Sequence, residues 1–413
     1  MTMDSNLIET AHQILQNFNE SIPQFLYGIE RQQFVANQLK NLEPDKRLIL
    51  RKLIDAFLVE MRTKNASDID LGSYGCHGNI WFRIHGEKVA DSGLGQFSEA
   101  ETDTLILNIL MEQQTQNLIK YRNVDFSYST TENGTLQRFR ADVYFDLEHL
   151  AMNMRLISSE VRPISAFNFH PEILKALSLK FVKRGLVLIT GITGSGKSTT
   201  MDSIIDANNR TVDSSIIIIG GPIEHVHEPK RCVVRHRSVG TDVLTFKDGA
   251  IQALRQDPDI IVVTEMRYAD TIITTLEITD SGHKVFSTLH TSSAVESINR
   301  IIAEVPSDEQ DRVRERLADV LTVVISQKLP RTLDNKRVLA KEVLLMIPPI
   351  RAAIKNNNLD EIYQMIQQSS HLGMITMEQD LKRLYEEKII SYEEAWANAN
   401  NKKRFEEIVK YKV

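Results

Sequence analysis

Cysteine is scarce in this chain of 413 residues, where only Cys76 and Cys232 are present. The two lie far apart and lack CxxC spacing, which argues against a disulfide framework and against a structural zinc site. Long apolar runs are missing as well, since none reaches the ~18 residues that a membrane-spanning helix needs. We therefore expect a globular protein that is stabilised by neither disulfides nor zinc and does not span a membrane.

An excess of positive charge is also missing. The chain has 49 Lys and Arg against 55 Asp and Glu, a formal net charge of −6. A nucleic-acid binder needs basic surface to neutralise phosphates, so we expect no nucleic acid among the partners. Residues 1–5 lack a basic region followed by an apolar stretch and do not resemble a secretory signal. We expect the protein in the cytoplasm.

The chain does have enough length for two or three domains, and its periodicity changes along the sequence. Residues 1–62 carry apolar side chains at helical spacing, which predicts a helical N-terminal extension. Residues 63–160 show strand patterns instead, with 81–84 and 140–145 apolar or alternating and with glycines between such runs. A small α+β domain is expected there.

Residues 161–345 alternate short apolar, β-branched runs with helix-length segments. These runs are 186–189, 216–219, 260–263 and 284–289. Strands that are apolar on both faces and separated by helices indicate a buried, mainly parallel sheet. We predict a doubly wound α/β domain at 161–345 and a helical C-terminal region at 346–413.

A glycine-rich loop follows the first of these runs. Residues 191–198 read GITGSGKS and match the pattern GxxxxGK[ST] between a strand and a helical segment. In such a loop backbone N–H groups cradle phosphates, Lys197 reaches the β and γ oxygens, and the Ser198 hydroxyl ligates Mg²⁺. Chance would produce the pattern in about 1–2% of chains this long. We predict an ATP and Mg²⁺ site whose nucleotide-binding residues are Thr193, Gly194, Ser195, Gly196, Lys197, Ser198 and Thr199.

Two carboxylates follow other predicted strands. Glu265 comes directly after the strand 260–263 and Thr264, at the sheet edge where open α/β sheets bind ligands, and it can hold the Mg²⁺ shell. Glu224 follows a third strand and Pro222, where it can polarise water. A solvated loop acid is the alternative for Glu224.

Two histidines flank the fourth strand, 284–289. His283 and His290 are seven residues apart, so a regular strand would turn them to opposite sides, and we expect no shared metal. His290 lies where the strand ends and can sense phosphate. A histidine satisfied within a core or loop is the alternative.

These elements occur in the order found in the type II/type IV secretion ATPase superfamily, which residues 60–405 resemble. The four motifs are a Walker A loop (191–198), an acidic Asp box (219–227), an atypical Walker B strand (257–267) and a His box (282–291). The resemblance implies a RecA-like P-loop core for the α/β domain.

The similarity extends beyond the core. Residues 66–69, 138–140 and 154–157 resemble the PAS-like N-terminal domain of that superfamily. Residues 349–356 are similar to the AIRNLIRE helix of its type IV pilus retraction (twitching motility) branch, and 371–378 resemble the next segment. Assembly ATPases usually carry a tetracysteine zinc motif that two cysteines cannot form. The retraction branch is therefore the closest.

The resemblance implies a hexameric ring at the cytoplasmic face of the inner membrane. The ring would use ATP and Mg²⁺ to power pilus retraction together with an inner-membrane platform protein and a second pilus ATPase. By motif position, Glu224 is the water-activating carboxylate, Glu265 the Walker B acid at Mg²⁺, and His290 a sensor. Arg140 and Arg155 are arginine fingers that reach a neighbour's nucleotide, with ordinary surface arginines as the alternative.

Two departures from the family pattern stand out. Gly220 and Gly221 occupy the positions where Glu-Asp usually precedes Pro, and Lys355 and Asn356 replace Arg-Glu in the later helix. They leave open a paralogue that binds ATP, hydrolyses it weakly or not at all, and regulates an active motor. A conjugation or type IVB secretion ATPase is a further alternative, and a nucleic-acid translocase is the least favoured.

Overall fold

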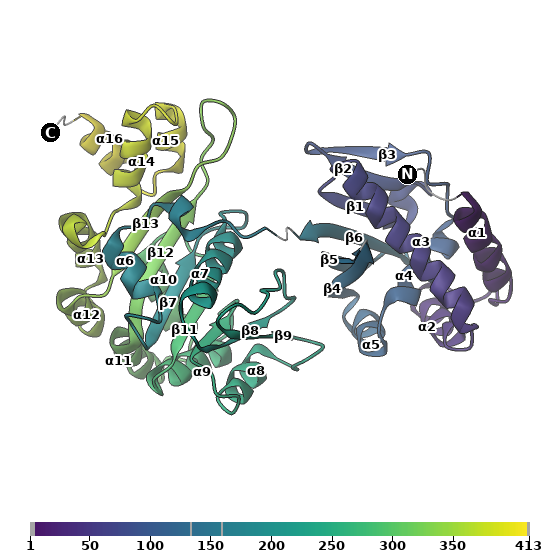
Figure 1. Ribbon diagram of the computed structural model, residues 1–413, viewed down its shortest axis with the longest axis horizontal. Helices are drawn as coiled ribbons and strands as arrows, with labels where there is room; N and C mark the ends of the chain where they lie inside the picture. Colours follow the sequence, from purple (N-terminus) through teal and green to yellow (C-terminus); the bar gives the residue numbers. More distant parts are fainter. Residues whose placement is uncertain (1–4, 133, 158–159, 411–413) are drawn as a thin grey trace. The chain divides into compact units, whose positions relative to one another are not determined.

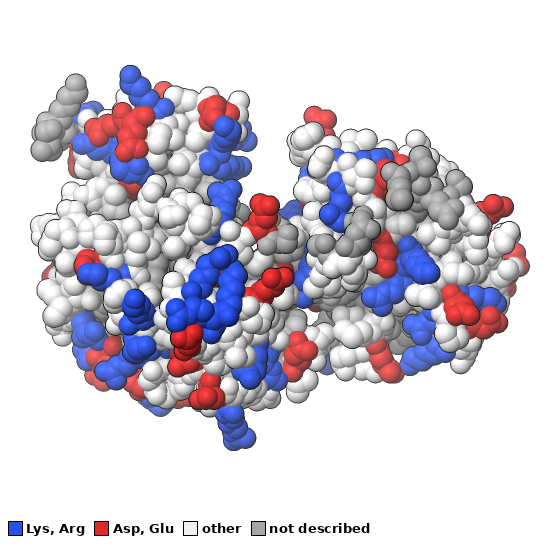
Figure 2. All heavy atoms as spheres, viewed as in Figure 1, with Lys and Arg blue, Asp and Glu red and all other residues white. Residues whose placement is uncertain are grey.

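The computed structural model describes residues 5–132, 134–157 and 160–410 (Figure 1). They form two compact units. The first comprises the described residues before Glu160 together with the segment Gly221–His225, and the second comprises the rest. Basic and acidic side chains are interspersed on the face of each unit that Figure 2 shows. Among the described residues, no helix is long and apolar enough to cross a membrane.

The first unit combines helices with an antiparallel sheet. Its helices are α1 (Ser5–Glu20), α2 (Gly28–Leu39), α3 (Pro44–Thr63), α4 (Glu99–Ile109) and α5 (Glu112–Tyr121), with the 3-10 turn η1 (Tyr74–Cys76). Its strands are β1 (Asp68–Gly72), β2 (Ile80–Ile84), β3 (Glu87–Asp91), β4 (Asn123–Glu132), β5 (Thr135–Asp146) and β6 (His149–Ile157). The sheet order is β3-β2-β1-β6-β5-β4, with antiparallel pairing throughout.

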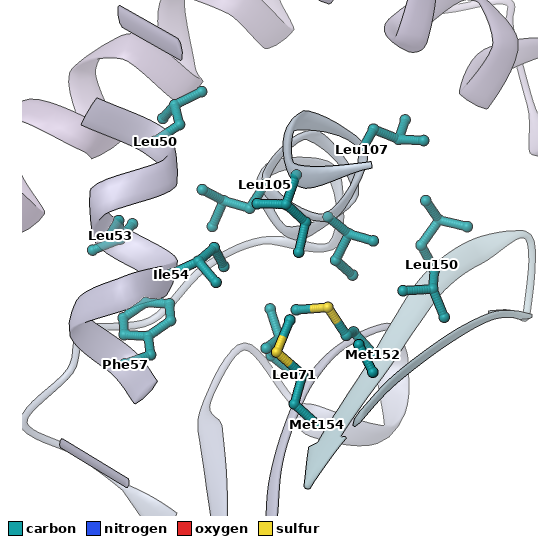
Figure 3. Packing of buried hydrophobic residues seen from close by; sticks show 14 of the residues in the cluster. Leu50, Leu53, Ile54, Phe57, Leu71, Leu105, Leu107, Leu150, Met152 and Met154 are labelled. Carbon is teal, nitrogen blue, oxygen red and sulfur yellow. The ribbon is translucent and has the colours of Figure 1, made fainter. Parts of the chain in front are cut away.

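Helix α3 shares its hydrophobic core with this sheet. Leu53 and Phe57 of α3, Leu105 of α4 and Met154 of β6 are fully buried in one cluster (Figure 3). The apolar spacing along α3 places Leu53 and Phe57 on a single face of that helix, as the sequence pattern indicates. Helices α1 and α2 add further residues to the same cluster. The N-terminal helices are thus part of the unit's core.

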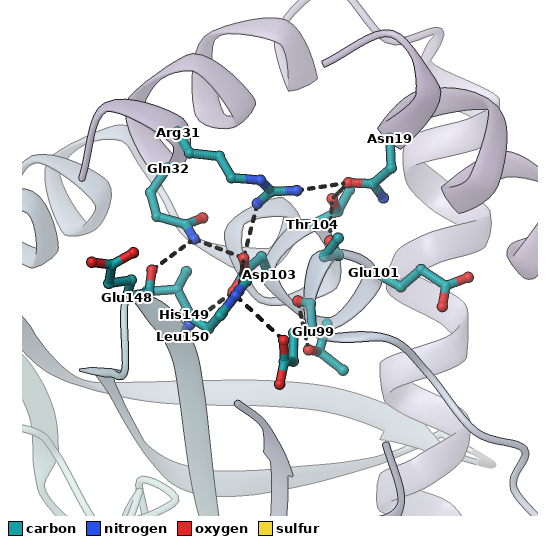
Figure 4. A network of polar contacts seen from close by, with 12 residues as sticks. Asn19, Arg31, Gln32, Glu99, Glu101, Asp103, Thr104, Glu148, His149 and Leu150 are labelled. Carbon is teal, nitrogen blue, oxygen red and sulfur yellow. Dashed lines mark hydrogen bonds and ion pairs between the residues drawn. The ribbon is translucent and has the colours of Figure 1, made fainter. Parts of the chain in front are cut away.

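A buried carboxylate fastens α2 to the rest of the unit. Asp103 of α4 accepts hydrogen bonds from Arg31 (2.9 Å), Gln32 (2.7 Å) and the backbone N–H of Leu150 (2.7 Å), and it contacts His149 Nδ1 at 2.9 Å (Figure 4). The hydrogen bond to Asp103 raises the pKa of His149 above its ordinary value. A buried charge is tolerated only when it is satisfied in this way.

The second unit contains a seven-stranded sheet. Its strands are β7 (Gly185–Thr190), β8 (Ser215–Gly220), β9 (Val233–Ser238), β10 (Ile260–Val263), β11 (Lys284–Leu289), β12 (Leu321–Lys328) and β13 (Ala340–Leu345). The order is β13-β12-β7-β11-β10-β8-β9, and only β12 and β13 pair antiparallel. The predicted mainly parallel sheet is confirmed, and the four runs read from the sequence are β7, β8, β10 and β11.

Helices cover both faces of this sheet. They are α6 (Pro171–Leu177), α7 (Lys197–Thr211), α8 (Phe246–Ala253), α9 (Ala269–Asp280), α10 (Ala294–Ala303) and α11 (Gln310–Val320), with the 3-10 turn η2 (Ile164–Phe167) before them. Leu186, Ile217 and Val285 point to the face that packs with α8–α11. Because side chains alternate along a strand, the intervening residues face the side where α7 contacts β7. The predicted doubly wound arrangement is confirmed.

The C-terminal region is helical, as predicted. It contains α12 (Pro348–Lys355), α13 (Ile362–Gln368), α14 (Met377–Glu386), α15 (Tyr392–Asn398) and α16 (Lys402–Lys410), with the 3-10 turns η3 (Leu359–Glu361) and η4 (Ser370–Leu372). Leu381, Leu384 and Phe405 form a small core with Ala340 of β13. Helices α14–α16 are therefore anchored on the edge strand of the sheet.

Candidate functional site

The glycine-rich loop leaves the centre of the parallel sheet. Strand β7 pairs with β11 on one side and β12 on the other, and every one of its residues is buried. The first loop residue, Gly191, has φ +149°, and a Cβ there would lie 2.3 Å from Ser195 Oγ and 2.6 Å from the Gln327 carbonyl oxygen. No side chain fits, so glycine alone allows the loop to turn back over the strand.

Helix α7 begins where the loop ends. Gly196 caps the helix with φ +88°, and Lys197 is its first residue. Ser198 and Thr199 lie exposed on the first turn, and Thr193 and Gly194 are exposed in the loop. The N-terminal amides and dipole of α7 together attract an anion to this point.

Two polar groups in the loop suit a phosphate ligand. Lys197 Nζ donates to the carbonyl oxygens of Gly191 (2.8 Å) and Ile192 (3.1 Å), so its ammonium group lies over the loop. The hydroxyl of Ser195 is buried, and within the described part of the chain it has no hydrogen-bond partner. An unsatisfied buried hydroxyl beside an ammonium group fits a bound anion.

Glu265 and His290 meet at the same edge of the sheet. His290 Nε2 lies 3.8 Å from Glu265 Oε1, because β10 and β11 are parallel neighbours and both residues follow the carboxyl end of their strand. Leu289 pairs with Thr190, so His290 and Gly191 follow paired residues. Burial and then the charge of Lys197 lower the pKa of His290, which keeps the imidazole neutral near pH 7.

The structure adds neighbours that sequence reasoning missed. Arg267 and Arg300 also lower the pKa of His290, and Arg300 Nη1 donates to the His290 carbonyl oxygen at 3.2 Å. Gln327 of β12 donates to Thr200 Oγ1 at 2.7 Å and thereby ties β12 to α7. Arg267 stands in the Walker B segment, whereas neither Arg300 nor Gln327 belongs to any of the four motifs.

His283 and His290 lie at opposite ends of β11. His283 precedes the strand, and its Nδ1 lies 3.1 Å from the Ile278 carbonyl oxygen and 3.0 Å from Ser281 Oγ. His290 follows the strand at the carboxyl end. The strand's length therefore separates the two rings.

The two predicted arginine fingers lie in the first unit. Arg140 of β5 and Arg155 of β6 are directly opposed in the antiparallel pairing. Asp125 binds Arg140 with two hydrogen bonds of 3.2 and 2.5 Å, and Asp68 accepts one of 2.8 Å from Arg155 Nε. The two arginines line a polar pocket of about 360 Å³ with Asn123, Asp125, Asp142 and Asn153.

Glu224 belongs to the short segment that is part of the first unit. Its Oε1 lies 3.4 Å from Arg140 Nη1, and the preceding Ile223 carbonyl oxygen accepts hydrogen bonds from Ser127 and Arg138. The end of the Asp box belongs to the second unit, where buried His227 contacts Asp202 of α7 at 3.1 Å. The structure thus groups Glu224 with the two arginines, and the loop, Glu265 and His290 with one another.

Comparison with known proteins identifies the family. A model described as Type II/IV secretion system protein matches residues 43–403, so the match includes α3. The chain is 37% identical over 323 residues to the "Type IV pilus retractation ATPase PilT" of Pseudomonas aeruginosa, covering 78% of this chain and 92% of the relative. It is 35% identical to a "Twitching motility protein" of Neisseria gonorrhoeae, covering 77% and 84%.

A solved structure supports the same assignment. The "Crystal Structure of the Pilus Retraction Motor PilT and Bound ADP" aligns with a TM-score of 0.76 and 35% identity, covering 85% of this chain and 98% of that one. The phosphate-binding loop described above is the element that a nucleotide requires. The chain therefore belongs to the type II/IV secretion ATPase family, closest to its PilT-type pilus retraction branch, and is a nucleotide-binding, ATP-hydrolysing enzyme of that class.

Proposed function

We propose that the chain is the motor subunit that powers type IV pilus retraction by hydrolysing ATP. The observation that carries the proposal is the convergence of Lys197, Glu265 and His290 beside the unsatisfied Ser195 hydroxyl, at the carboxyl edge of a parallel sheet. This arrangement occurs in a chain that resembles a retraction motor over most of its length. The site supplies a cation, a carboxylate and a neutral imidazole around one anion-binding loop.

The residues have distinct roles in this proposal. Thr193, Gly194, Ser195, Gly196 and Thr199 surround the phosphates, and Lys197 leaves the Gly191 carbonyl to reach the β and γ oxygens. Ser198 and Glu265 hold Mg²⁺, since hydroxyl and carboxylate oxygens are the ligands this ion takes. When bound, Mg²⁺ neutralises the negative charge on the phosphate oxygens. Neutral His290 donates a hydrogen bond to phosphate, and Glu224 orients and activates the attacking water.

Assembly completes the proposed site. Arg140 and Arg155 reach the nucleotide of a neighbouring subunit, which makes the ring a requirement for fast hydrolysis. A planar guanidinium is suited to this role because it can bind two transferring-phosphate oxygens at once. We expect a homohexamer at the cytoplasmic face of the inner membrane, in contact with a pilus platform protein and with a second pilus ATPase.

One observation favours a second candidate, a weakly hydrolysing paralogue that co-assembles with an active motor. Gly220 ends β8 and Gly221 opens the segment that carries Glu224, so the usual acidic pair is replaced by residues with no side chain. Paired glycines loosen this segment and remove two charges near the phosphates. A conjugation or type IVB secretion ATPase is the third reading, which the retraction-type C-terminal helix makes less favoured.

Phosphate release by the purified protein, measured together with its mass in solution, tests the proposal. The active-motor function requires Mg²⁺-dependent release above that of Lys197→Ala, and a mass near six chains with ATP. The biological role is then tested by measuring pilus retraction force in cells whose only copy is either the natural protein or Lys197→Ala. Hydrolysis at the level of Lys197→Ala would favour the regulatory paralogue.

A further inference from the structure

Glu342 of β13 joins two helices at their first residues. Its side chain is 2% exposed, and one carboxylate oxygen accepts a 2.7 Å hydrogen bond from the backbone N–H of Ala294, the first residue of α10. The other oxygen accepts a longer bond of 3.4 Å from the backbone N–H of Met377, the first residue of α14. A single carboxylate therefore faces two helix N-termini, which favour negative charge.

The electrostatic setting makes these two bonds important. Burial first, and then the nearby Glu378 carboxylate, raise the pKa of Glu342, while the two hydrogen bonds and Lys328 lower it, and the net result is a pKa of about 7. In the described part of the chain, Glu342 forms no ion pair within 4.0 Å. A buried carboxylate without a close cation depends on its hydrogen bonds for compensation.

One of the two helices connects directly to the nucleotide site. Helix α10 begins four residues after His290, and its Arg300 donates to the His290 carbonyl oxygen. In the same connection, the Ser292 carbonyl oxygen accepts a 3.1 Å hydrogen bond from Asn400, which precedes α16. The segment from His290 to Ala294 is thus held to the C-terminal helices at two points.

A second path runs through the end of β12. Lys328 donates to the Asn398 carbonyl oxygen at 2.6 Å, at the end of α15. It directly follows Gln327, whose side chain bonds Thr200 on α7. Both strands flanking the loop strand therefore lead to the same three helices, α14–α16.

We propose that Glu342 is a positioning residue that couples the His290 segment to helices α14–α16, so that nucleotide binding changes how firmly these helices are held. The inference rests on the proposed role of His290 as a phosphate contact. A phosphate that draws His290 toward the loop shifts the start of α10, and Glu342 transmits the shift to the start of α14. Because such coupling is reciprocal, the state of α14–α16 also alters nucleotide affinity.

Hydrogen exchange of the full-length protein, with and without ADP and Mg²⁺, tests the coupling. In the natural protein ADP should slow exchange both in the phosphate-binding loop and in the first turn of α14, residues 377–380. In Glu342→Gln the loop should remain protected, while protection at 377–380 falls by about fivefold or more. Comparing the two regions separates coupling from nucleotide binding. If ADP failed to protect the loop in the natural protein, the proposed nucleotide site itself would be overturned.

A matched control and a second variant exclude a purely structural effect. Asp380→Asn alters another buried carboxylate of α14, which accepts a hydrogen bond from the Lys341 N–H and, among the described residues, forms no hydrogen bond or ion pair with α10. It should lower stability yet keep the ADP effect at 377–380. Glu342→Asp keeps the carboxylate but shortens the side chain by one methylene, so that a single group no longer reaches the N–H groups of both Ala294 and Met377. It should lose the effect as Glu342→Gln does, and retention of the effect in both variants would overturn the proposal.

Discussion

Arg140 and Arg155 occupy opposed positions on β5 and β6, and each is bound by a carboxylate from the strand on its other side. Asp125 of β4 binds Arg140, and Asp68 of β1 binds Arg155. Because they are directly opposed in one antiparallel pair, the two guanidinium groups lie on one face of the sheet, in a pocket that Asp125 and Asp142 also line. The Arg155 side chain is 67% exposed although it is paired with Asp68. An exposed arginine held in a fixed direction is well suited to contact a second molecule.

We expect Arg140→Ala and Arg155→Ala each to lower kcat by about 10³-fold, because an arginine finger stabilises charge only in the transition state. ADP affinity should change little, because the phosphate-binding loop belongs to the other unit. Steady-state phosphate release and ADP titration measure the two quantities. Arg83→Ala is the matched control, since Arg83 also contacts Asp68, at 3.8 Å, and it should retain activity.

Mixed rings test whether these arginines act on a neighbour. A Lys197→Ala subunit has intact arginines and an Arg155→Ala subunit has an intact loop, so mixing the two should restore turnover that neither shows alone. Activity that never rises above the sum of the separate preparations would argue against action between subunits.

Lys197→Ala should abolish turnover, with a loss of about 10²-fold or more. The reason is that no other loop residue brings a mobile positive charge to the β and γ oxygens. ADP should then fail to raise the melting temperature of the variant, as a thermal-shift assay will show. Lys183→Ala, an exchange of an exposed lysine just before β7, serves as the control.

The glycine pair should slow hydrolysis without preventing it. Glu265, Lys197 and His290 are all present, but the segment carrying Glu224 starts from Gly220 and Gly221, and a loosely held base is a poor one. Replacing the pair by Glu-Asp should raise kcat, and Glu224→Gln in the natural background should remove the remaining activity. If neither change alters phosphate release, Glu224 is not the base.

Glu342 should make stability depend on pH. Its pKa is about 7 in the folded protein and near the ordinary value of 4.5 when unfolded, so the folded state retains a proton that the unfolded chain releases. The stability it contributes is complete below pH 4.5 and is lost as pH rises through 7. As pH rises from about 5.5 to about 8, the free energy of unfolding of Glu342→Gln should increase by about 2 kcal/mol relative to that of the natural protein. Melting temperatures across this range measure the change, and parallel curves would contradict it.

Asp103→Asn should destabilise the first unit by about 3 kcal/mol, because it leaves Arg31 and His149 without their shared carboxylate. Glu99→Gln provides the comparison. Glu99 lies 3.4 Å from His149 and is far more exposed, so its loss should cost less than about 1 kcal/mol. Thermal melts that show equal destabilisation by the two variants would contradict a special role for the buried Asp103 carboxylate.

The sequence allows prediction of features that depend on local pattern. The loop 191–198 is contiguous, and its glycines are dictated by backbone geometry, so it can be recognised without a structure. Glu265 and His290 can be placed together because both end strands of one parallel sheet. Their roles in catalysis stay predictions.

Contacts between distant segments could not be predicted in this way. Nothing local links Glu224 to Arg140 or Glu342 to Ala294, since these pairs are 84 and 48 residues apart. The fully buried Glu342 also defies the expectation that glutamate lies at the surface. Whether the first helices would join the core of the sheet was equally open, because a helical apolar stripe does not reveal what it packs against.

The sheet order determines when, during synthesis, the chain can first bind nucleotide. During synthesis β7 emerges before both of its partners, since β11 follows at Lys284–Leu289 and β12 at Leu321–Lys328. At about 5–20 residues per second, the ribosome needs several seconds or more to supply them. A nascent chain that has already exposed its glycine-rich loop therefore has no sheet to hold that loop in shape. The phosphate-binding loop can therefore take its final shape only after residues 284–328 have been synthesised.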